Sequence, residues 1–277
     1  FKQKTAYEIP KRDWSSDVCS SDLMPAEWKT IILFCAGAIG GCMNSIAGGG
    51  SLITFPALLW AGLPSIQANA TNTWSVMGGI GTSLWSYKGE LGAQRTWVMR
   101  YLGPSLFGGL VGSLLLLWTG ETVFSNMVPY LLMFAAAIFT FQGYILKLFQ
   151  IEAHAIENSR YGPTIAMFVQ FLVAVYGGYF GAGIGILMLA ALGLMGQKDI
   201  IAMNSLKVLQ GALINGVACI IFVLLTKIHW IECITLASGS ALGGILGPML
   251  ARRVGPKLVR GLVSVIGFGI AFYYLLH

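Results

Sequence analysis

The sequence predicts an all-α fold, a polytopic bundle of transmembrane helices, from its composition and from the spacing of its charges. Of the 277 residues, 56% are hydrophobic and only 10% are charged, whereas a soluble domain carries about 25% charged residues. A helix of about 20 apolar residues crosses a hydrocarbon core of about 30 Å, and it satisfies its own backbone hydrogen bonds, as lipid requires. Four long runs contain no charged side chain: Ile31–Leu63, Tyr101–Trp118, Met127–Leu146 and Ile214–Thr226.

The succession of apolar segments predicts about eight to ten membrane segments. Two of them, 51–62 and 185–196, are too short to cross the bilayer comfortably, so we expect glycine-broken half-helices packed inside the protein. The expected segments are 30–47, 51–62, 68–87, 99–118, 126–149, 164–182, 185–196, 200–226, 231–250 and 258–276.

Residues 1–23 depart from this pattern. They are polar, contain no apolar stretch of the kind that a signal peptide has, and resemble a translated sequencing-adapter artefact. We expect Met24 to be the native start and residues 1–23 to be a disordered tail without function; a genuine short cytoplasmic tail is the alternative. The tail holds four basic and four acidic residues, so the net charge of +6 does not depend on it.

A polar linker, residues 150–163, separates two halves, 24–149 and 164–277, which we predict to be transmembrane repeats. Glycine-rich stretches that start at Ala47 and Gly181 match at an offset of 134 residues. Further matches in the same order indicate duplication. They pair Ala68–Thr71 with Ala202–Ser205 and, with one extra residue, Gly108–Gly112 with Gly243–Gly247.

The basic loops indicate that the two repeats are inverted. Lys and Arg collect in the cytoplasmic loops of membrane proteins. The basic loop follows the third segment of the first half but the fourth segment of the second half, so placing both inside turns one half over. Inverted repeats are typical of secondary transporters, whose site lies at the repeat interface near mid-membrane. The residues concerned are Lys88, Arg95 and Arg100, and then Arg252, Arg253, Lys257 and Arg260.

Two glycine-rich breaks are candidate binding elements. Glycines between apolar segments allow a helix to stop and restart inside the membrane, and the restarting N-terminus offers free N–H groups and a positive dipole end to an anion. Close helix packing through small residues is the alternative, and it is the interpretation that we prefer for Gly108, Gly109 and Gly112. The candidate residues are Gly48, Gly49, Gly50 and Ser51 in the first break, with Asn44 before it, and Gly181, Gly183 and Gly185 in the second.

Polar residues open the helix that follows each break. At 100° per residue, Asn204, Lys207, Gly211 and Asn215 share one face. Lys207 lies about 10 Å into its segment, and an ionisable residue at that depth indicates function; snorkelling to the interface is the alternative. Every acidic residue after Met24 lies at a segment end or in a loop, which favours an anion over a cation. Ser205, next to Asn204, is a further candidate for the site. In the first half Thr71, Ser75, Gly78 and Thr82 share a face, with Asn69 and Asn72 nearby.

These motifs resemble the TauE/SafE permeases, also called the sulfite exporter family. The first repeat carries AGGGS at 47–51, FPAL at 55–58 and ANATN at 68–72, and the second carries YFGAGIG at 179–185 and AMNSLK at 202–207. The resemblance covers about residues 30–276, although the second break lacks a full triplet of glycines. It implies a bacterial inner-membrane permease for small anions such as sulfite or organosulfonates, with proton coupling left open. It places the site at Gly48–Ser51, Asn69, Asn72, Gly181–Gly185, Asn204 and Lys207.

Other functions have less support in the sequence. A membrane enzyme would need clustered His, Cys or carboxylate residues, and no metal or catalytic motif is present, so we expect no catalytic residue, metal or cofactor. The expected partners are the lipid bilayer and a small anionic substrate, without nucleic acid, and a homodimer is left open. A non-transporting accessory subunit, and a permease of the same fold with a non-sulfur cargo, remain alternatives.

Overall fold

The computed structural model describes residues 26–46, 48–157, 162–194, 197, 199–254 and 256–276, and the elements in this part of the chain are all α-helices. The predicted all-α class is confirmed. The tail 1–23, with both hypotheses about it, lies outside the described residues. The helices are α1 (Ala26–Ile46), α2 (Ser51–Trp60), α3 (Ser65–Ser86), α4 (Lys88–Ala93), α5 (Arg95–Thr119), α6 (Glu121–Glu157), α7 (Gly162–Tyr179), α8 (Ile184–Leu194), α9 (Ile200–Leu225), α10 (Trp230–Val254) and α11 (Pro256–Leu276).

The two predicted half-helices are present as α2, with 10 residues, and α8, with 11. Two features differ from the expected segments. Helix α6 continues to Glu157, so the first part of the predicted linker is helical. The basic loop after α3 contains a six-residue helix, α4, which apolar periodicity does not mark because its sequence, KGELGA, is short and polar.

The outer surface of the bundle is suited to lipid. Phe107, Leu224 and Val265 are 66%, 72% and 73% exposed, whereas soluble proteins rarely expose extended apolar patches. By length and composition alone, three helices in the described part of the chain are long and apolar enough to cross a membrane: Arg95–Thr119, Glu121–Ile145 and Ile201–Leu225. Other apolar helical segments, of 10–17 residues, are shorter. The polytopic helix bundle is confirmed, while the expected number of spans stays a prediction.

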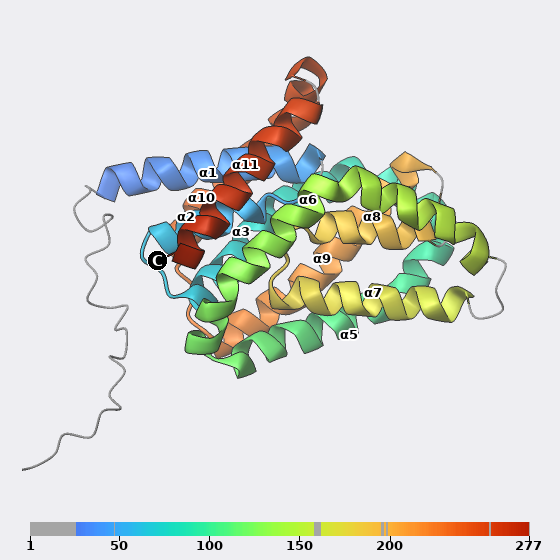
Figure 1. The fold of residues 1–277 in the computed structure, drawn as a ribbon, viewed down its shortest axis with the longest axis horizontal. Coiled ribbons are helices and arrows are strands. Elements are labelled where there is room, and N and C mark those ends of the chain that lie inside the picture. Colours follow the sequence, from blue (N-terminus) through green and yellow to red (C-terminus); the bar gives the residue numbers. More distant parts are fainter. Residues whose placement is uncertain are drawn as a thin grey trace, which may run out of the picture.

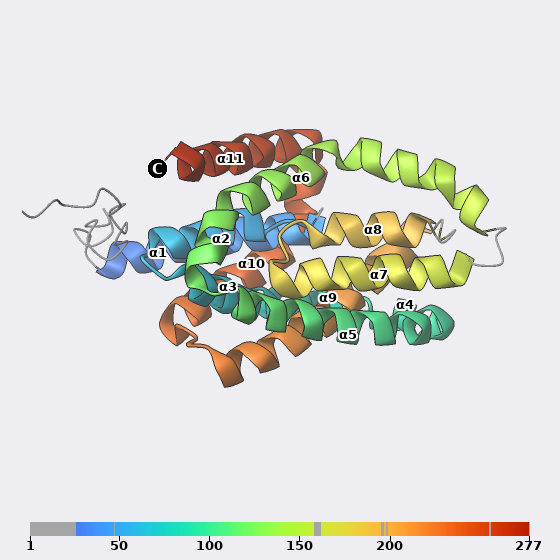
Figure 2. The same ribbon diagram turned by 60° about the horizontal axis from the view of Figure 1, so that its bottom comes forward.

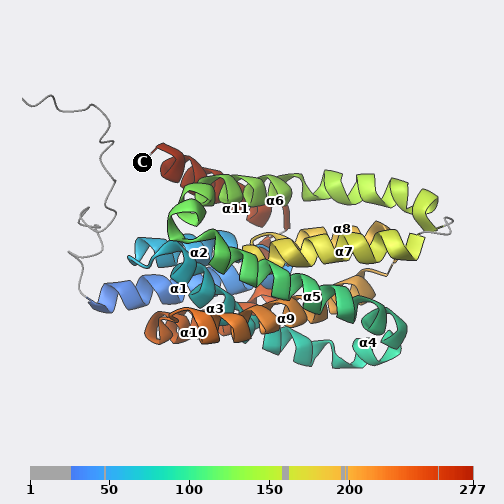
Figure 3. The same ribbon diagram turned by 90° about the horizontal axis from the view of Figure 1, so that it is seen from below.

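Helices of the two predicted halves interlock through small residues. Helix α1 packs along α10, and α5 packs along α7 (Figures 1 and 3). A Cβ atom at Gly37 or Gly41 of α1 would collide with the α10 backbone at Leu236 or Ser240. Gly108, Gly109 and Gly112 of α5 likewise contact the backbones or small side chains of α7 and α9. These contacts bring helix backbones close together, as small residues do in membrane proteins.

The half-helices occupy the middle of the bundle and extend toward opposite ends. In Figures 2 and 3, α2 lies toward the left and α8 toward the right. Helices α3 and α9, which follow them in sequence, pack against each other. The end that α2 approaches also holds the starts of α3 and α6, where the Ile66 N–H donates to Glu121 Oε2 over 3.1 Å. Helix α4 marks the opposite end.

The α1–α10 contact provides a test of this packing. Gly41→Ala should lower the free energy of unfolding by about 1–3 kcal/mol, because the new methyl group overpacks the contact with Ser240. Thermal unfolding in detergent, followed by size-exclusion chromatography, measures the change. The matched control is Gly81→Ala, because a Cβ there meets nothing within 4 Å. Equal effects of the two substitutions would contradict the packing described here.

Candidate functional site

The two glycine breaks meet in the middle of the bundle. Gly48 has φ +74°, and Gly181 and Gly183 both have φ +76°, a left-handed conformation that glycine adopts without strain. A Cβ atom on Gly48 would lie only 3.1 Å from Cα of Gly185. The first break therefore contacts the second directly, and a side chain at Gly48 would push them apart.

Each break ends where a half-helix begins. Helix α2 starts at Ser51 and α8 at Ile184. The N–H groups of Leu52, Ile53 and Thr54 donate to carbonyls of the first break, and those of Ile184 and Ile186 donate to carbonyls of the second. The breaks thus cap both half-helices, whose positive dipole ends point back toward them. Gly49 and Ser51 of the first break, and Gly181 and Ile184 of the second, line one cavity. Two positive helix ends thus contribute to the same space, a combination that favours an anion.

The cavity has a volume of about 320 Å³, within the usual range for small-ligand sites of about 300–1,000 Å³. From the breaks it follows α3 toward the α4 end, past Asn72, Val76 and Ser83 to Tyr87. Helices α1, α8, α9 and α10 complete its walls, with Asn44, Met188, Val208 and Gly244 among the lining residues. Of the described residues that line it, Lys207 alone is charged, and none is acidic.

Lys207 is buried in the wall of this cavity. Its side chain is 6% exposed, and its Nζ donates to Asn204 Oδ1 over 3.0 Å. The snorkelling interpretation does not fit these facts, because a snorkelling lysine would carry its ammonium to the surface. Gly211 and Asn215, predicted to share the Lys207 face, also line the cavity. An anion entering it would therefore meet an ammonium that has a neutral protein partner.

Asn72 is held in one orientation by a neighbour that sequence reasoning missed. The Thr54 hydroxyl of α2 donates to Asn72 Oδ1, and both side chains are buried. The same hydroxyl lies 3.2 Å from the Gly50 carbonyl oxygen, but its bond to Asn72 is the shorter. Since that bond uses the Asn72 carbonyl oxygen and Asn72 lines the cavity, its Nδ2 hydrogens are the donors left for a ligand. The sequence gives only one signal for Thr54: together with Ser51 it is polar, at the start of an otherwise apolar segment.

The predicted site residues divide into eight that line the cavity and five that do not. The five lie behind the lining residues. Asn69 Nδ2 donates to the Tyr179 carbonyl at the end of α7 over 3.1 Å, Ser205 accepts from Gln94 Nε2 over 3.1 Å, and Asn204 bonds Lys207. Gly50 packs against Gly40, and Gly183 against Ala135. The residues that line the cavity are Asn44, Gly48, Gly49, Ser51, Asn72, Gly181, Gly185 and Lys207.

Helix α3 presents a different face to the cavity from the one that the sequence indicated. Of the four residues predicted to share that face, only Thr82 lines the cavity. Thr71 accepts from the His229 N–H, and Ser75 donates to the Cys233 carbonyl, so both contact the α9–α10 region. The contact with α10 decides this rotation, and helical periodicity alone cannot show it. Sequence reasoning also missed Thr73, Tyr87 and Phe180, which line the cavity.

Comparison with known proteins gives the family. Residues 33–274 match the family model described as "Sulfite exporter TauE/SafE". The chain belongs to this family. Within the part of the chain that the structure describes, no three His, Cys, Asp or Glu side chains come together as metal ligands. The TauE/SafE membership and the helical architecture make the chain a multi-pass bacterial membrane transporter and not an enzyme, as the sequence predicted.

Several curated relatives align over nearly their whole length. A "Probable membrane transporter protein" of Haemophilus influenzae is 30% identical over 240 residues, which cover 86% of this chain and 91% of the relative. "Probable membrane transporter protein ORF9" of a Sinorhizobium species is 29% identical, with 88% and 91% covered. "Probable membrane transporter protein YfcA" of Escherichia coli K12 is 27% identical, with 85% of each chain covered. No solved structure matches the chain.

The bond between Thr54 and Asn72 gives a test of the site. Thr54→Val keeps the shape of the side chain but removes the donor, so the Asn72 amide loses its fixed orientation. We expect substrate affinity to fall by about five- to tenfold, the effect of about one buried hydrogen bond. Binding of sulfite to purified protein, measured by calorimetry, gives the affinity. Thr54→Ser, which keeps the hydroxyl group, is the control. An unchanged affinity in Thr54→Val would show that the Thr54 bond does not orient Asn72 for binding.

Proposed function

We propose that the chain is a secondary transporter of small oxyanions, with sulfite or an organosulfonate as its substrate. One observation carries the proposal: the buried Lys207 ammonium shares a cavity with the N-terminal ends of α2 and α8, and none of the described lining residues is acidic. The family description, which names sulfite export, supports the choice of a sulfur oxyanion.

The electrostatics favour an anion over a cation or a neutral solute. Removing an ammonium from water costs several kcal/mol unless an opposite charge compensates it. The protein partner of Lys207 is Asn204, whose amide oxygen is neutral. A bound anion would supply the missing charge, and a cation would meet repulsion from Lys207 and from both helix ends. The site is therefore more favourable with an anion present.

The donors of the cavity also match the shape of an oxyanion. Sulfite and sulfonate groups present three oxygen atoms, each able to accept hydrogen bonds from different directions. The α2 and α8 N-termini, Lys207 Nζ and Asn72 Nδ2 come from different helices and can bond different oxygens. This division of the donors between both halves means that movement of one half changes the affinity.

Inverted repeats give this site a transport mechanism. The half-helices start at touching glycines and extend to opposite ends of the bundle (Figure 2), which supports the inverted arrangement. In such transporters the two repeats rock about a site between them, so that it opens to each side in turn. We extend this mechanism to the present chain, with the repeats 24–149 and 164–277.

Flux through reconstituted protein tests the proposal. Protein starting at Met24, placed in liposomes, should carry radiolabelled sulfite, and unlabelled sulfite should compete; the response to a pH gradient then tests proton coupling. Lys207→Gln should lower kcat/KM about 100-fold, because it removes the charge from a desolvated pair. The control is Lys227→Gln, since Lys227 is exposed after α9.

Other results would redirect the proposal. Normal sulfite transport by Lys207→Gln would exclude direct contact between Lys207 and the anion. Transport of sulfonates without sulfite transport would keep the anion site and change the substrate. Folded protein that carries none of these anions would favour the accessory-subunit alternative.

A further inference from the structure

We propose that Phe180 is the gate residue that closes the substrate cavity toward the α2–α3 end of the bundle. The inference rests on the transport function proposed above. Phe180 lines the cavity and also belongs to a buried aromatic cluster, Phe55, Phe124, Tyr179 and Phe180, whose other members do not line it. Its ring is therefore a wall that the cavity and the cluster share.

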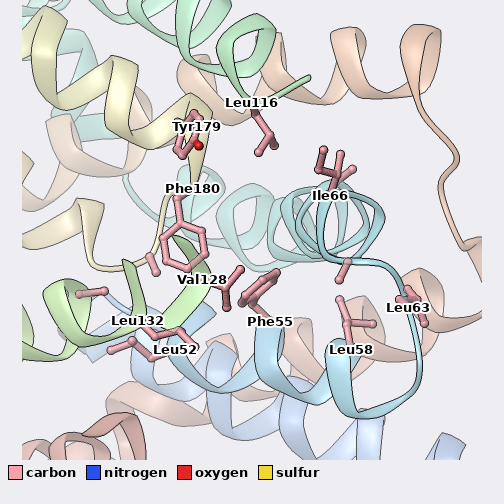
Figure 4. Close-up of a cluster of buried hydrophobic side chains, with 14 of the residues drawn as sticks. Leu52, Phe55, Leu58, Leu63, Ile66, Leu116, Val128, Leu132, Tyr179 and Phe180 are labelled. Carbon is pink, nitrogen blue, oxygen red and sulfur yellow. The ribbon is translucent and has the colours of Figure 1, made fainter. Parts of the chain in front are cut away.

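Buried aromatic rings cover the cavity on this side. The Phe180 ring meets the Phe55 ring edge to face, with centroids 5.2 Å apart and planes at 86°, and meets Phe124 at 6.3 Å. Phe55 and Phe124 are fully buried. Figure 4 shows Phe180 pointing toward Phe55 and Val128, and Leu58, Leu63 and Ile66 continue the apolar packing beyond them.

The cavity extends in the other direction. It follows α3 from Asn72 to Tyr87, beside α4, and Tyr87, Ser83 and Thr82 are only partly buried. The described conformation thus gives the site a path toward the α4 end and closes it toward the α2–α3 end. A transporter that alternates between two sides must also open the site toward the α2–α3 end and close it toward the α4 end. Phe180 lies where the first of these changes has to occur.

The backbone next to Phe180 is suited to such a movement. Helix α7 ends at Tyr179, and Gly181 and Gly183 follow with positive φ angles. Glycines accept large changes of φ and ψ without a steric penalty, as residues at hinges must. A rotation at Gly181 would carry the Phe180 ring away from Phe55 and Phe124. The same glycines belong to the break that holds the anion, so binding and gating share one segment.

Accessibility of a cavity thiol tests the gate without a transport measurement. Ser51→Cys places the thiol in the cavity, in a background whose native cysteines are replaced by serine. The probe is the membrane-impermeant, anionic sulfonatoethyl methanethiosulfonate, applied to right-side-out and to inside-out vesicles. We expect fast labelling from the face that carries α4 and slow labelling from the other face. Phe180→Ala should raise the slow rate at least about tenfold, because two aromatic contacts of the closed state are lost.

Phe222→Ala is the matched control, because Phe222 is a fully buried core phenylalanine that does not line the cavity. Equal labelling rates in the Phe180→Ala and Phe222→Ala backgrounds would overturn the gate, and so would fast labelling of the parent protein from both faces. If Phe180→Ala does not fold, Phe55→Ala removes the same contact from the opposite ring. Faster labelling in a protein that carries no anion would leave the gate and reject the proposed function. Normal sulfite flux, together with a labelling rate that Phe180→Ala does not change, would reject the gate and leave the proposed function.

Discussion

The contact between the two glycine breaks is the constraint on which the rest of the structure depends. Backbone N–H groups at membrane depth need partners, and lipid supplies none. By ending helices at Ile46 and Tyr179 and restarting them at Ser51 and Ile184, the chain places two helix N-termini side by side. Several of their first N–H groups donate to the carbonyl oxygens of the breaks themselves. The close packing of α1 with α10 and of α5 with α7 holds the breaks together. The positive ends of both half-helices therefore lie at one cavity.

Lys207 gives this polar centre its sign. A lysine buried beside a neutral asparagine costs stability, and a fold that served only its own stability would replace it with an apolar residue. The cost is understandable if an anion occupies the cavity during part of the cycle. Helix ends and the lysine then act on the same ligand from both halves. In the proposed cycle, the described structure, with its aromatic cluster on one side and its path along α3 on the other, is one of two conformations.

Much of the fold could be predicted from the sequence because lipid imposes a simple rule. Uncharged runs became helices close to the expected bounds, and the short segments at 51–62 and 185–196 became α2 and α8. Helical spacing also put Lys207, Gly211 and Asn215 on one face, and all three line the cavity, while Asn204 of the same predicted face bonds Lys207 without lining it. That this cavity binds the substrate stays a prediction. The rotation of α3 about its axis could not be predicted. Thr71 and Ser75 are polar, as residues that line a site are, yet they bond the α9–α10 region. Phe180 could not be distinguished from core phenylalanines, since its role depends on which space its ring borders.

An experimental structure with selenite, a heavier analogue of sulfite, tests the central claim most directly. Selenium scatters anomalously, so a crystal of the protein soaked in selenite locates the anion without ambiguity. We predict one strong peak in the cavity, within hydrogen-bond distance of Lys207 Nζ and beside the N-terminus of α2 or α8. A peak only outside this cavity, or a cavity that stays free of selenium at saturating selenite, would contradict the anion site.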